Sequence, residues 1–162
     1  MTGAALVALG ERLQGVCLGR GLSVAAAESC TGGLIAEAIT SVPGSSGYFL
    51  GSVVSYANSA KAALLGVPET MLETHGAVSA QVARAMASGA RERFGADLAV
   101  SATGIAGPDG GTPAKPVGLT YLGLADAEGV DVRRLNLDGG RAANREAAAA
   151  AALAWLLERA ER

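Results

Sequence analysis

Apolar positions along the chain follow two kinds of spacing. Stretches with an apolar residue every three or four positions predict amphipathic helices. We expect such helices at residues 4–18, 31–40, 58–66, 68–76, 79–94 and 141–161. Short continuous apolar runs bounded by turn-forming residues predict buried strands instead. We expect strands at residues 22–27, 48–56, 96–102, 119–125 and 130–137.

The order of these elements predicts the fold class. Helices and strands alternate early in the chain, whereas the last two strands are joined only by the short turn at residues 126–129. So short a turn joins antiparallel strands, and the helical crossovers are typical of parallel ones. With 162 residues, half of them hydrophobic, the chain can bury one substantial core. We predict a single α/β domain over residues 1–162, a three-layer α/β/α sandwich around a mixed sheet.

Composition narrows the classes of partner and compartment. The net charge is −2 and basic residues do not cluster, so we expect no nucleic-acid partner. Cys17 and Cys30 are too few for a disulfide framework, which indicates a reducing compartment. The first residues lack the basic region of a signal peptide, and the longest apolar run, 147–157, is too short to span a bilayer. We therefore expect a soluble cytoplasmic protein that binds no membrane.

Reactive side chains are concentrated where the first strand turns into the next helix. Residues 25–33 read AAAESCTGG, which places a carboxylate, two hydroxyls and a thiol beside two glycines. The first turn of a helix leaves N–H groups without partners, so this corner can receive an anion or a developing oxyanion. A hydroxyl or thiol there is well placed to be a nucleophile. The alternative is that Ser29 or Thr31 only caps the helix and the glycines only turn the chain.

The sequence offers few candidate bases for such a nucleophile. His75 is the single histidine, and its place beside a glycine near a helix end is more typical of a structural group. Of the 13 basic residues only Lys61 and Lys115 are lysines, and lysine, unlike arginine, can lose its proton. Lys61 follows the second strand among apolar neighbours, which lower the pKa of an amine. This favours a pair of Ser29 and Lys61, while a solvated helix lysine is the alternative interpretation.

Two further features bear on the chemistry. Residues 103–118 read TGIAGPDGGTPAKPVG, and ordered loops of this length in compact domains are usually functional. The chain has no set of His, Cys, Asp and Glu spaced as metal ligands, so we expect neither a metal nor another cofactor.

Four strings occur in an order that resembles a known family. AESCTGG, YANSAK at residues 56–61, HGAVS at 75–79 and the string at 103–118 together resemble the C-terminal domain of the CinA (competence/damage-inducible) proteins. Stand-alone members are nicotinamide-nucleotide amidases, which hydrolyse the carboxamide of nicotinamide mononucleotide to nicotinate mononucleotide and ammonia without a metal. The resemblance implies the single-domain form, without the larger N-terminal domain of full-length CinA proteins, and a homo-oligomer.

The resemblance also implies roles for individual residues. Ser29 would be the nucleophile, Lys61 the base, and Tyr56 would orient Lys61 or pass a proton. Thr103 and Gly104 would supply donors to the substrate or the oxyanion. The full set of expected substrate-binding residues is Cys30, Thr31, Gly32, Gly33, Ser46, Asn58, Thr103, Gly104, Arg141 and Arg145.

The chain departs from the family pattern at two places. The usual GDR before the last helix is Gly139, Gly140 and Arg141 here, and the usual YSN has Ala57 in place of serine. The missing aspartate leaves open how Arg141 and Arg145 are held. These two arginines, one helical turn apart, are the candidate cations for a substrate phosphate. A solvated helix start is the alternative interpretation for both.

Two functions from different classes stay open. The first is an amidase acting on nicotinamide mononucleotide in the recycling of pyridine nucleotides, including NAD. The second is a catalytically silent nucleotide-binding module that kept the pocket. Within the first, Cys30 is a rival nucleophile, because thiolates are strong nucleophiles and a helix N-terminus lowers the pKa of a thiol. The presence of Ser29, Lys61, Tyr56 and Thr103 favours the enzyme.

Overall fold

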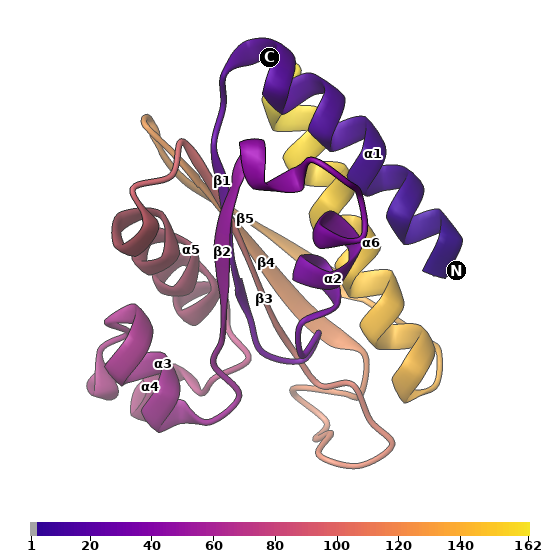
Figure 1. Cartoon of the computed structure of the whole chain (residues 1–162). Coiled ribbons are helices and arrows are strands. Elements are labelled where there is room, and N and C mark those ends of the chain that lie inside the picture. Colours follow the sequence, from indigo (N-terminus) through magenta and orange to yellow (C-terminus); the bar gives the residue numbers. More distant parts are fainter. Residues whose placement is uncertain (1–2) are drawn as a thin grey trace.

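A five-stranded sheet lies between two layers of helices, as predicted from the sequence (Figure 1). The computed structural model describes residues 3–162. The strands are β1 (Val24–Glu28), β2 (Phe49–Val54), β3 (Leu98–Gly104), β4 (Leu119–Asp126) and β5 (Gly129–Asn136). The helices are α1 (Gly3–Arg20), α2 (Leu34–Thr40), α3 (Asn58–Leu65), α4 (Glu69–His75), α5 (Ala80–Phe94) and α6 (Arg141–Ala160), with a 3₁₀ turn, η1 (Ser45–Gly47).

The sheet is mixed, which confirms the predicted fold class. Its strand order is β2-β1-β3-β4-β5. β1 pairs in parallel with both β2 and β3, while β4 is antiparallel to β3 and to β5. The carboxyl ends of β1, β2 and β3 therefore meet at one edge of the sheet. The starts of α3 and α6 lie at this same edge, at the bottom of Figure 1. Crevices at the carboxyl ends of strands are where open α/β sheets bind ligands.

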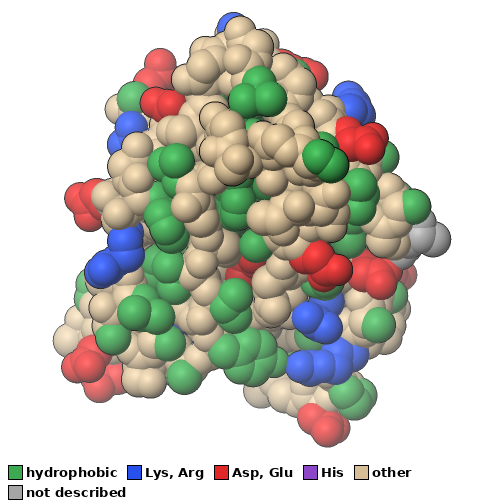
Figure 2. Space-filling model, in the orientation of Figure 1, with side chains coloured by type: hydrophobic (Ala, Val, Ile, Leu, Met, Phe, Trp, Pro, Cys, Tyr) green, Lys and Arg blue, Asp and Glu red, His purple; other side chains and the backbone are tan. Residues whose placement is uncertain are grey.

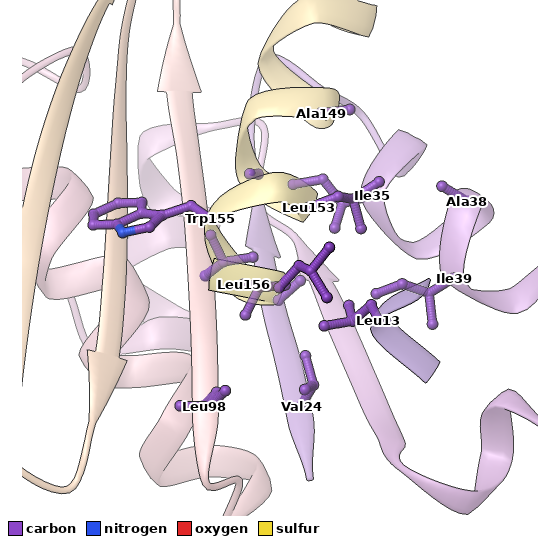
Figure 3. Close-up of a cluster of buried hydrophobic side chains, with 14 of the residues drawn as sticks. Leu13, Val24, Ile35, Ala38, Ile39, Leu98, Ala149, Leu153, Trp155 and Leu156 are labelled. Atoms are coloured by element: carbon purple, nitrogen blue, oxygen red, sulfur yellow. The ribbon is translucent and has the colours of Figure 1, made fainter. Parts of the chain in front are cut away.

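Two hydrophobic clusters hold the layers together. α1, α2 and α6 cover one face of the sheet, and Figure 3 shows their side chains converging over β1 and β3. The residues that meet there include Leu13, Val24, Ile35, Ile39, Leu98, Leu153 and Leu156. α3, α4 and α5 cover the other face around Leu65, Leu72, Val82, Met86 and Ala90. No helix within residues 3–162 has both the length and the apolar character needed to cross a membrane.

Among the element boundaries that differ from the prediction, two affect the glycine turn and the long loop. The helix expected from residue 31 begins at Leu34, because Gly32 and Gly33 adopt φ of 60° and 106°. These left-handed conformations do not continue a right-handed helix. The strand expected to end at residue 102 extends through Gly104. Thr103 and Gly104 pair with Tyr121 and Thr120 of β4, so the long loop begins only after them.

Gly89 allows α5 to lie directly against the end of α3. A Cβ atom at this position would collide with the backbone carbonyl of Leu65. Because Leu65 belongs to the same helix as Lys61, this contact sets the distance between α3 and the rest of the domain. Gly15 is the matched opposite case, since it is exposed in the interior of α1 and a Cβ atom there would meet nothing within 4 Å.

We expect Gly89→Ala to lower the free energy of unfolding by about 1–3 kcal/mol, the usual cost of overpacking. Gly15→Ala should raise it by roughly 0.5–1 kcal/mol, because alanine loses less conformational entropy in a helix. Urea denaturation of both variants checks the prediction. Equal effects of the two substitutions would mean that α3 can move away from α5 at little cost.

Candidate active site

Ser29 lies directly beyond the end of β1. Its backbone N–H donates to the carbonyl of Ala102 in β3 at 2.9 Å, which ties the turn to the neighbouring strand. The residue is only 8 % exposed. The chain turns away from the sheet here because the following residues include Gly32 and Gly33. The Ser29 hydroxyl is therefore held at the edge of the sheet where β1, β2 and β3 end.

Lys61 reaches this hydroxyl from α3. Its ammonium nitrogen lies 2.9 Å from Ser29 Oγ, 2.8 Å from the Ser55 carbonyl and 3.1 Å from the Tyr56 carbonyl. The residue is fully buried. Among the salt bridges within residues 3–162, none involves Lys61. The pairing of Ser29 with Lys61 that the sequence favoured is thus present in the structure, and the interpretation of Lys61 as a solvated helix lysine is wrong.

Burial lowers the pKa of Lys61, because desolvation disfavours the charged amine, while the nearby thiol of Cys30 has a smaller opposing effect. A neutral amine has two N–H donors and one lone pair. The carbonyls of Ser55 and Tyr56 take two donors. The third position on the nitrogen, which faces Ser29 Oγ, is then free to accept the hydroxyl proton. The geometry can support proton transfer from serine to lysine.

The helix start beside Ser29 does not have the free donors that the sequence predicted. The Glu28 carboxylate accepts hydrogen bonds from the N–H groups of Gly33, Ile35 and Ala36 at 2.9–3.2 Å. Thr31 Oγ1 also donates to it, at 2.8 Å. The expectation of an anion site at the first turn of α2 is therefore wrong, because a side chain of the protein already occupies those donors.

Arg145 and Arg141 come from the first turns of α6. Arg145 donates from Nε to the Cys30 carbonyl at 3.1 Å and from Nη2 to the Thr31 carbonyl at 3.0 Å. Arg141 donates from Nη1 to the Gly107 carbonyl at 2.8 Å. Its Nη2 donates to the Tyr56 hydroxyl at 3.0 Å. Carbonyl groups thus hold both arginines, and no aspartate before α6 is needed.

These contacts also rule out a purely solvated helix start for the two arginines. Figure 2 shows basic side chains gathered over the region where α6 begins in Figure 1. Glycine is favoured at position 32 beside them because its φ is 60°, and a Cβ atom there would also lie 2.9 Å from Nη2 of Arg145. The turn after Ser29 is consequently held from two sides. Glu28 accepts a hydrogen bond from an N–H group of the turn, and Arg145 donates to two of its carbonyl groups.

Cys30 is buried next to Ser29, and burial raises the pKa of its thiol to about 11. This is opposite to the lowering that a helix N-terminus would produce. Nucleophilic thiolate is therefore scarce near neutral pH. Cys30 contributes its carbonyl to Arg145, whereas the Ser29 hydroxyl contacts the amine of Lys61.

Three other expected residues make contacts that agree only in part with the roles implied for them. Tyr56 orients Lys61 with its backbone carbonyl, whereas its side chain is 60 % exposed and contacts Arg141. Thr103 is buried, and its hydroxyl donates to the Ala77 carbonyl at 2.8 Å, so that proton is already engaged. Gly104 ends β3 close to Thr120, where a side chain would not fit.

Three residues considered from the sequence lie outside the pair formed by Ser29 and Lys61. Ser46 is in η1, at the start of β2, and β2 runs parallel to β1, so Ser46 lies at the opposite end of the sheet from Ser29. Its assignment to the site of its own chain is wrong. Asn58 is exposed at the start of α3. His75 is exposed at the end of α4, and its carbonyl accepts from Lys115.

Sequence reasoning missed three residues that organise the site. Glu28 was recognised only as one of several reactive groups, although a carboxylate at the end of an apolar strand signals a buried acceptor. Ser52 donates to Glu28 Oε2 at 2.9 Å from the adjacent strand. Asn144, which is buried, donates to the Ala106 carbonyl at 3.0 Å and so attaches the long loop to α6. Nothing in the spacing of Ser52 or Asn144 indicates these contacts.

A cleft of about 840 Å³ lies at the opposite end of the sheet, between the β4–β5 turn and the ends of α5 and α6. Its charged lining residues are balanced: four arginines (Arg84, Arg91, Arg159, Arg162) face four carboxylates (Asp97, Asp126, Glu128, Asp131).

Within residues 3–162, no three His, Cys, Asp or Glu side chains gather closely enough to hold a metal ion.

The fold and the site define a class of α/β protein with a buried serine–lysine pair where parallel strands end. The chain belongs to the family of the CinA C-terminal domain, whose model matches residues 7–160. A CinA-like protein of Geobacter sulfurreducens is 58 % identical over 140 residues, which are 86 % of this chain and 34 % of the relative. A CinA-like protein of Citrifermentans bemidjiense is 58 % identical over 136 residues, 84 % of this chain and 33 % of the relative.

Solved structures agree with this family membership. The competence/damage inducible protein CihA from Agrobacterium tumefaciens is 42 % identical, with a TM-score of 0.93 over 98 % of this chain and 96 % of that one. A CinA superfamily protein from Escherichia coli is 29 % identical, with a TM-score of 0.92 over 98 % of this chain and 93 % of that one. The chain spans about a third of the length of the two curated relatives but nearly all of the two solved structures.

The burial of Lys61 predicts a pH-dependent stability that Lys61→Met should remove. Between the lowered folded pKa and the ordinary value of 10.5, the unfolded chain binds the proton and the folded chain does not. The free energy of unfolding of the wild type should therefore rise with pH in this window, relative to the variant, by up to about 1.4 kcal/mol per pH unit. Below the folded pKa both states are protonated and the difference should be constant.

Urea denaturation of both proteins between about pH 7 and pH 10 measures this difference. Subtracting the variant's free energy of unfolding from that of the wild type removes the contributions of other groups that titrate in the same range. A difference that does not change with pH would show that Lys61 binds its proton equally well in the folded and the unfolded chain.

Proposed function

We propose that this chain is an amidohydrolase that converts nicotinamide mononucleotide to nicotinate mononucleotide and ammonia. The observation that carries the proposal is the 2.9 Å contact between Ser29 Oγ and the buried amine of Lys61. Membership of the CinA C-terminal domain family supports it, because the resemblance noted in the sequence implies this reaction. The reaction would belong to the recycling of pyridine nucleotides.

In the proposed mechanism, Ser29 Oγ attacks the carboxamide carbon while Lys61 takes the hydroxyl proton. The tetrahedral intermediate collapses as the C–N bond breaks, and Lys61 returns a proton to the departing ammonia. A water molecule then attacks the ester on Ser29, again with Lys61 as the base, and nicotinate mononucleotide is released. Lys61 ends each half-reaction neutral, so the lowered pKa of its amine suits both steps.

The turn after Ser29 offers donors for the negatively charged intermediate. The N–H of Ser29 is used by Ala102, and the N–H of Gly32 donates to the Ser29 carbonyl. Within residues 3–162, the N–H groups of Cys30 and Thr31 have no oxygen acceptor. Backbone donors next to a nucleophile are typical of oxyanion holes, where losing one costs about 10²–10³ in rate. These two N–H groups are better candidates for this role than the engaged hydroxyl of Thr103.

Arg141 and Arg145 are the candidates for binding the substrate phosphate. The two recorded hydrogen bonds of each arginine leave further N–H donors on both guanidinium groups. Both lie in the first turns of α6, where the helix dipole adds to the attraction for an anion. A nucleotide held there would extend toward Ser29, because Arg145 contacts the residues that follow the nucleophile.

Ammonia release from nicotinamide mononucleotide tests the proposal directly. The wild type should release ammonia, and Ser29→Ala should lose at least about 10³-fold of this activity while still binding the nucleotide. Cys30→Ala is the matched control, because it removes the adjacent nucleophile and should retain most activity. A wild type that binds the nucleotide without releasing ammonia would be a silent binding module instead.

Lys61→Arg separates proton transfer from simple electrostatics. Arginine keeps the positive charge but does not lose its proton near neutral pH, since its pKa exceeds about 12. We expect the rate to fall by about 10²-fold or more, nearly as far as in Lys61→Ala, with a much smaller change in substrate affinity. In the wild type, kcat/KM should rise with pH through the lowered pKa of Lys61. An active Lys61→Arg enzyme with an unchanged pH profile would remove Lys61 from the mechanism.

A further inference from the structure

Glu28, the residue before the proposed nucleophile, is fully buried and accepts five hydrogen bonds. Three come from backbone N–H groups at the start of α2 and two from hydroxyls. Among the salt bridges within residues 3–162, none involves this carboxylate. A buried carboxylate is costly unless many donors compensate it, so this arrangement needs all its partners in place. The five donors belong to Thr31, Gly33, Ile35, Ala36 and Ser52.

The donors connect three segments that meet around Ser29. Glu28 is the last residue of β1, Thr31 and Gly33 lie in the turn, and Ser52 belongs to β2. Other bonds also hold the turn: Ser29 N–H is bound to β3, and Arg145 donates to two carbonyl groups. Within the turn, Gly32 N–H donates to the Ser29 carbonyl and Leu34 N–H to the Thr31 carbonyl. Among these restraints the Glu28 carboxylate is the one that joins the turn to both β1 and β2. The direction of the Ser29 side chain therefore depends on how firmly the carboxylate fixes the residues that follow it.

We propose that Glu28 is a positioning residue of the active site, whose carboxylate fixes the Ser29–Gly33 turn and thereby aims Ser29 Oγ at the amine of Lys61. Ser52 assists by holding the second carboxylate oxygen from the neighbouring strand. This inference rests on the proposed roles of Ser29 and Lys61, but not on the identity of the amide substrate. Glu28 touches neither Lys61 nor the reacting atoms, so its effect is transmitted through the turn.

The reactivity of Ser29 itself tests the inference without the substrate. Phenylmethylsulfonyl fluoride reacts with an activated serine: Ser29 Oγ bonds to sulfur, the S–F bond breaks, fluoride leaves and Lys61 takes the proton. Mass spectrometry of the intact protein gives the labelling rate, and a peptide digest identifies Ser29. Labelling is measured at a temperature where urea denaturation shows every variant to be fully folded.

Ser52→Ala removes one donor and leaves four, and should slow labelling by roughly threefold to tenfold. Glu28→Gln replaces one accepting carboxylate oxygen by an NH₂ group, which cannot accept a hydrogen bond from the donors that face it. This variant should slow labelling by about 10²-fold. The matched control is Ser101→Ala, because Ser101 is buried in β3 and bonds to Ala83 and Gly123 on the other face of the sheet. Its labelling rate should equal that of the wild type.

The pH at which labelling is half-maximal should not change in Ser52→Ala, because Lys61 stays buried and keeps its bonds to the Ser55 and Tyr56 carbonyls. A purely structural role for Glu28 predicts instead that folded Ser52→Ala and Ser101→Ala are labelled at the same rate, which would overturn the inference. So would a wild type in which Ser29 is not labelled. A protein that is labelled as predicted but releases no ammonia from nicotinamide mononucleotide would refute the proposed substrate and leave the role of Glu28 standing.

Discussion

The burial of one amine without a counter-ion is the constraint on which the site depends. Removing an ammonium ion from water costs several kcal/mol unless it is paired, and a neutral amine avoids most of that cost. Within residues 3–162, the hydrogen-bond partners of the Lys61 amine are two carbonyl groups and the Ser29 hydroxyl. This environment stabilises the protonation state that a general base requires. The close contact of α5 with the end of α3 at Gly89 helps to fix the helix that carries Lys61.

The side chains of Glu28 and Arg145 differ from the amine of Lys61, because hydrogen-bond partners compensate their charge. Glu28 is equally buried but is surrounded by five donors, which stabilise a carboxylate. Arg145 donates to two carbonyl groups of the turn and stays partly buried. Charge is thus compensated at Glu28 and Arg145, which hold the backbone, and is disfavoured at Lys61, where the proposed mechanism moves a proton. The two arrangements are compatible because Glu28 and Lys61 contact different parts of the turn.

The sequence predicted the features that depend on local patterns of residues, namely the secondary-structure elements and the candidate base. Periodicity located the six helices and five strands, and the scarcity of lysine drew attention to Lys61. It did not predict that Glu28 would fill the donors of α2, because spacing alone does not reveal which way a strand-end side chain points. Ser46 was misplaced since only the parallel pairing of β1 and β2 shows at which end of the sheet η1 lies. Likewise, the sequence does not reveal that the hydroxyl of Thr103, one of the expected donors, already donates to the Ala77 carbonyl.

The neighbouring Ser29 and Cys30 show why direction matters more here than intrinsic acidity. A thiol is the more acidic group in solution and would be the first choice of nucleophile on chemical grounds. Cys30, however, is buried where its pKa rises to about 11, so the protein disfavours its thiolate. Ser29 has the less acidic group, but its oxygen lies within hydrogen-bonding distance of an amine whose pKa is lowered by burial. In the proposed mechanism the nucleophile is therefore selected by the shape of the turn, which Glu28 and Arg145 hold, and not by the intrinsic reactivity of the side chain.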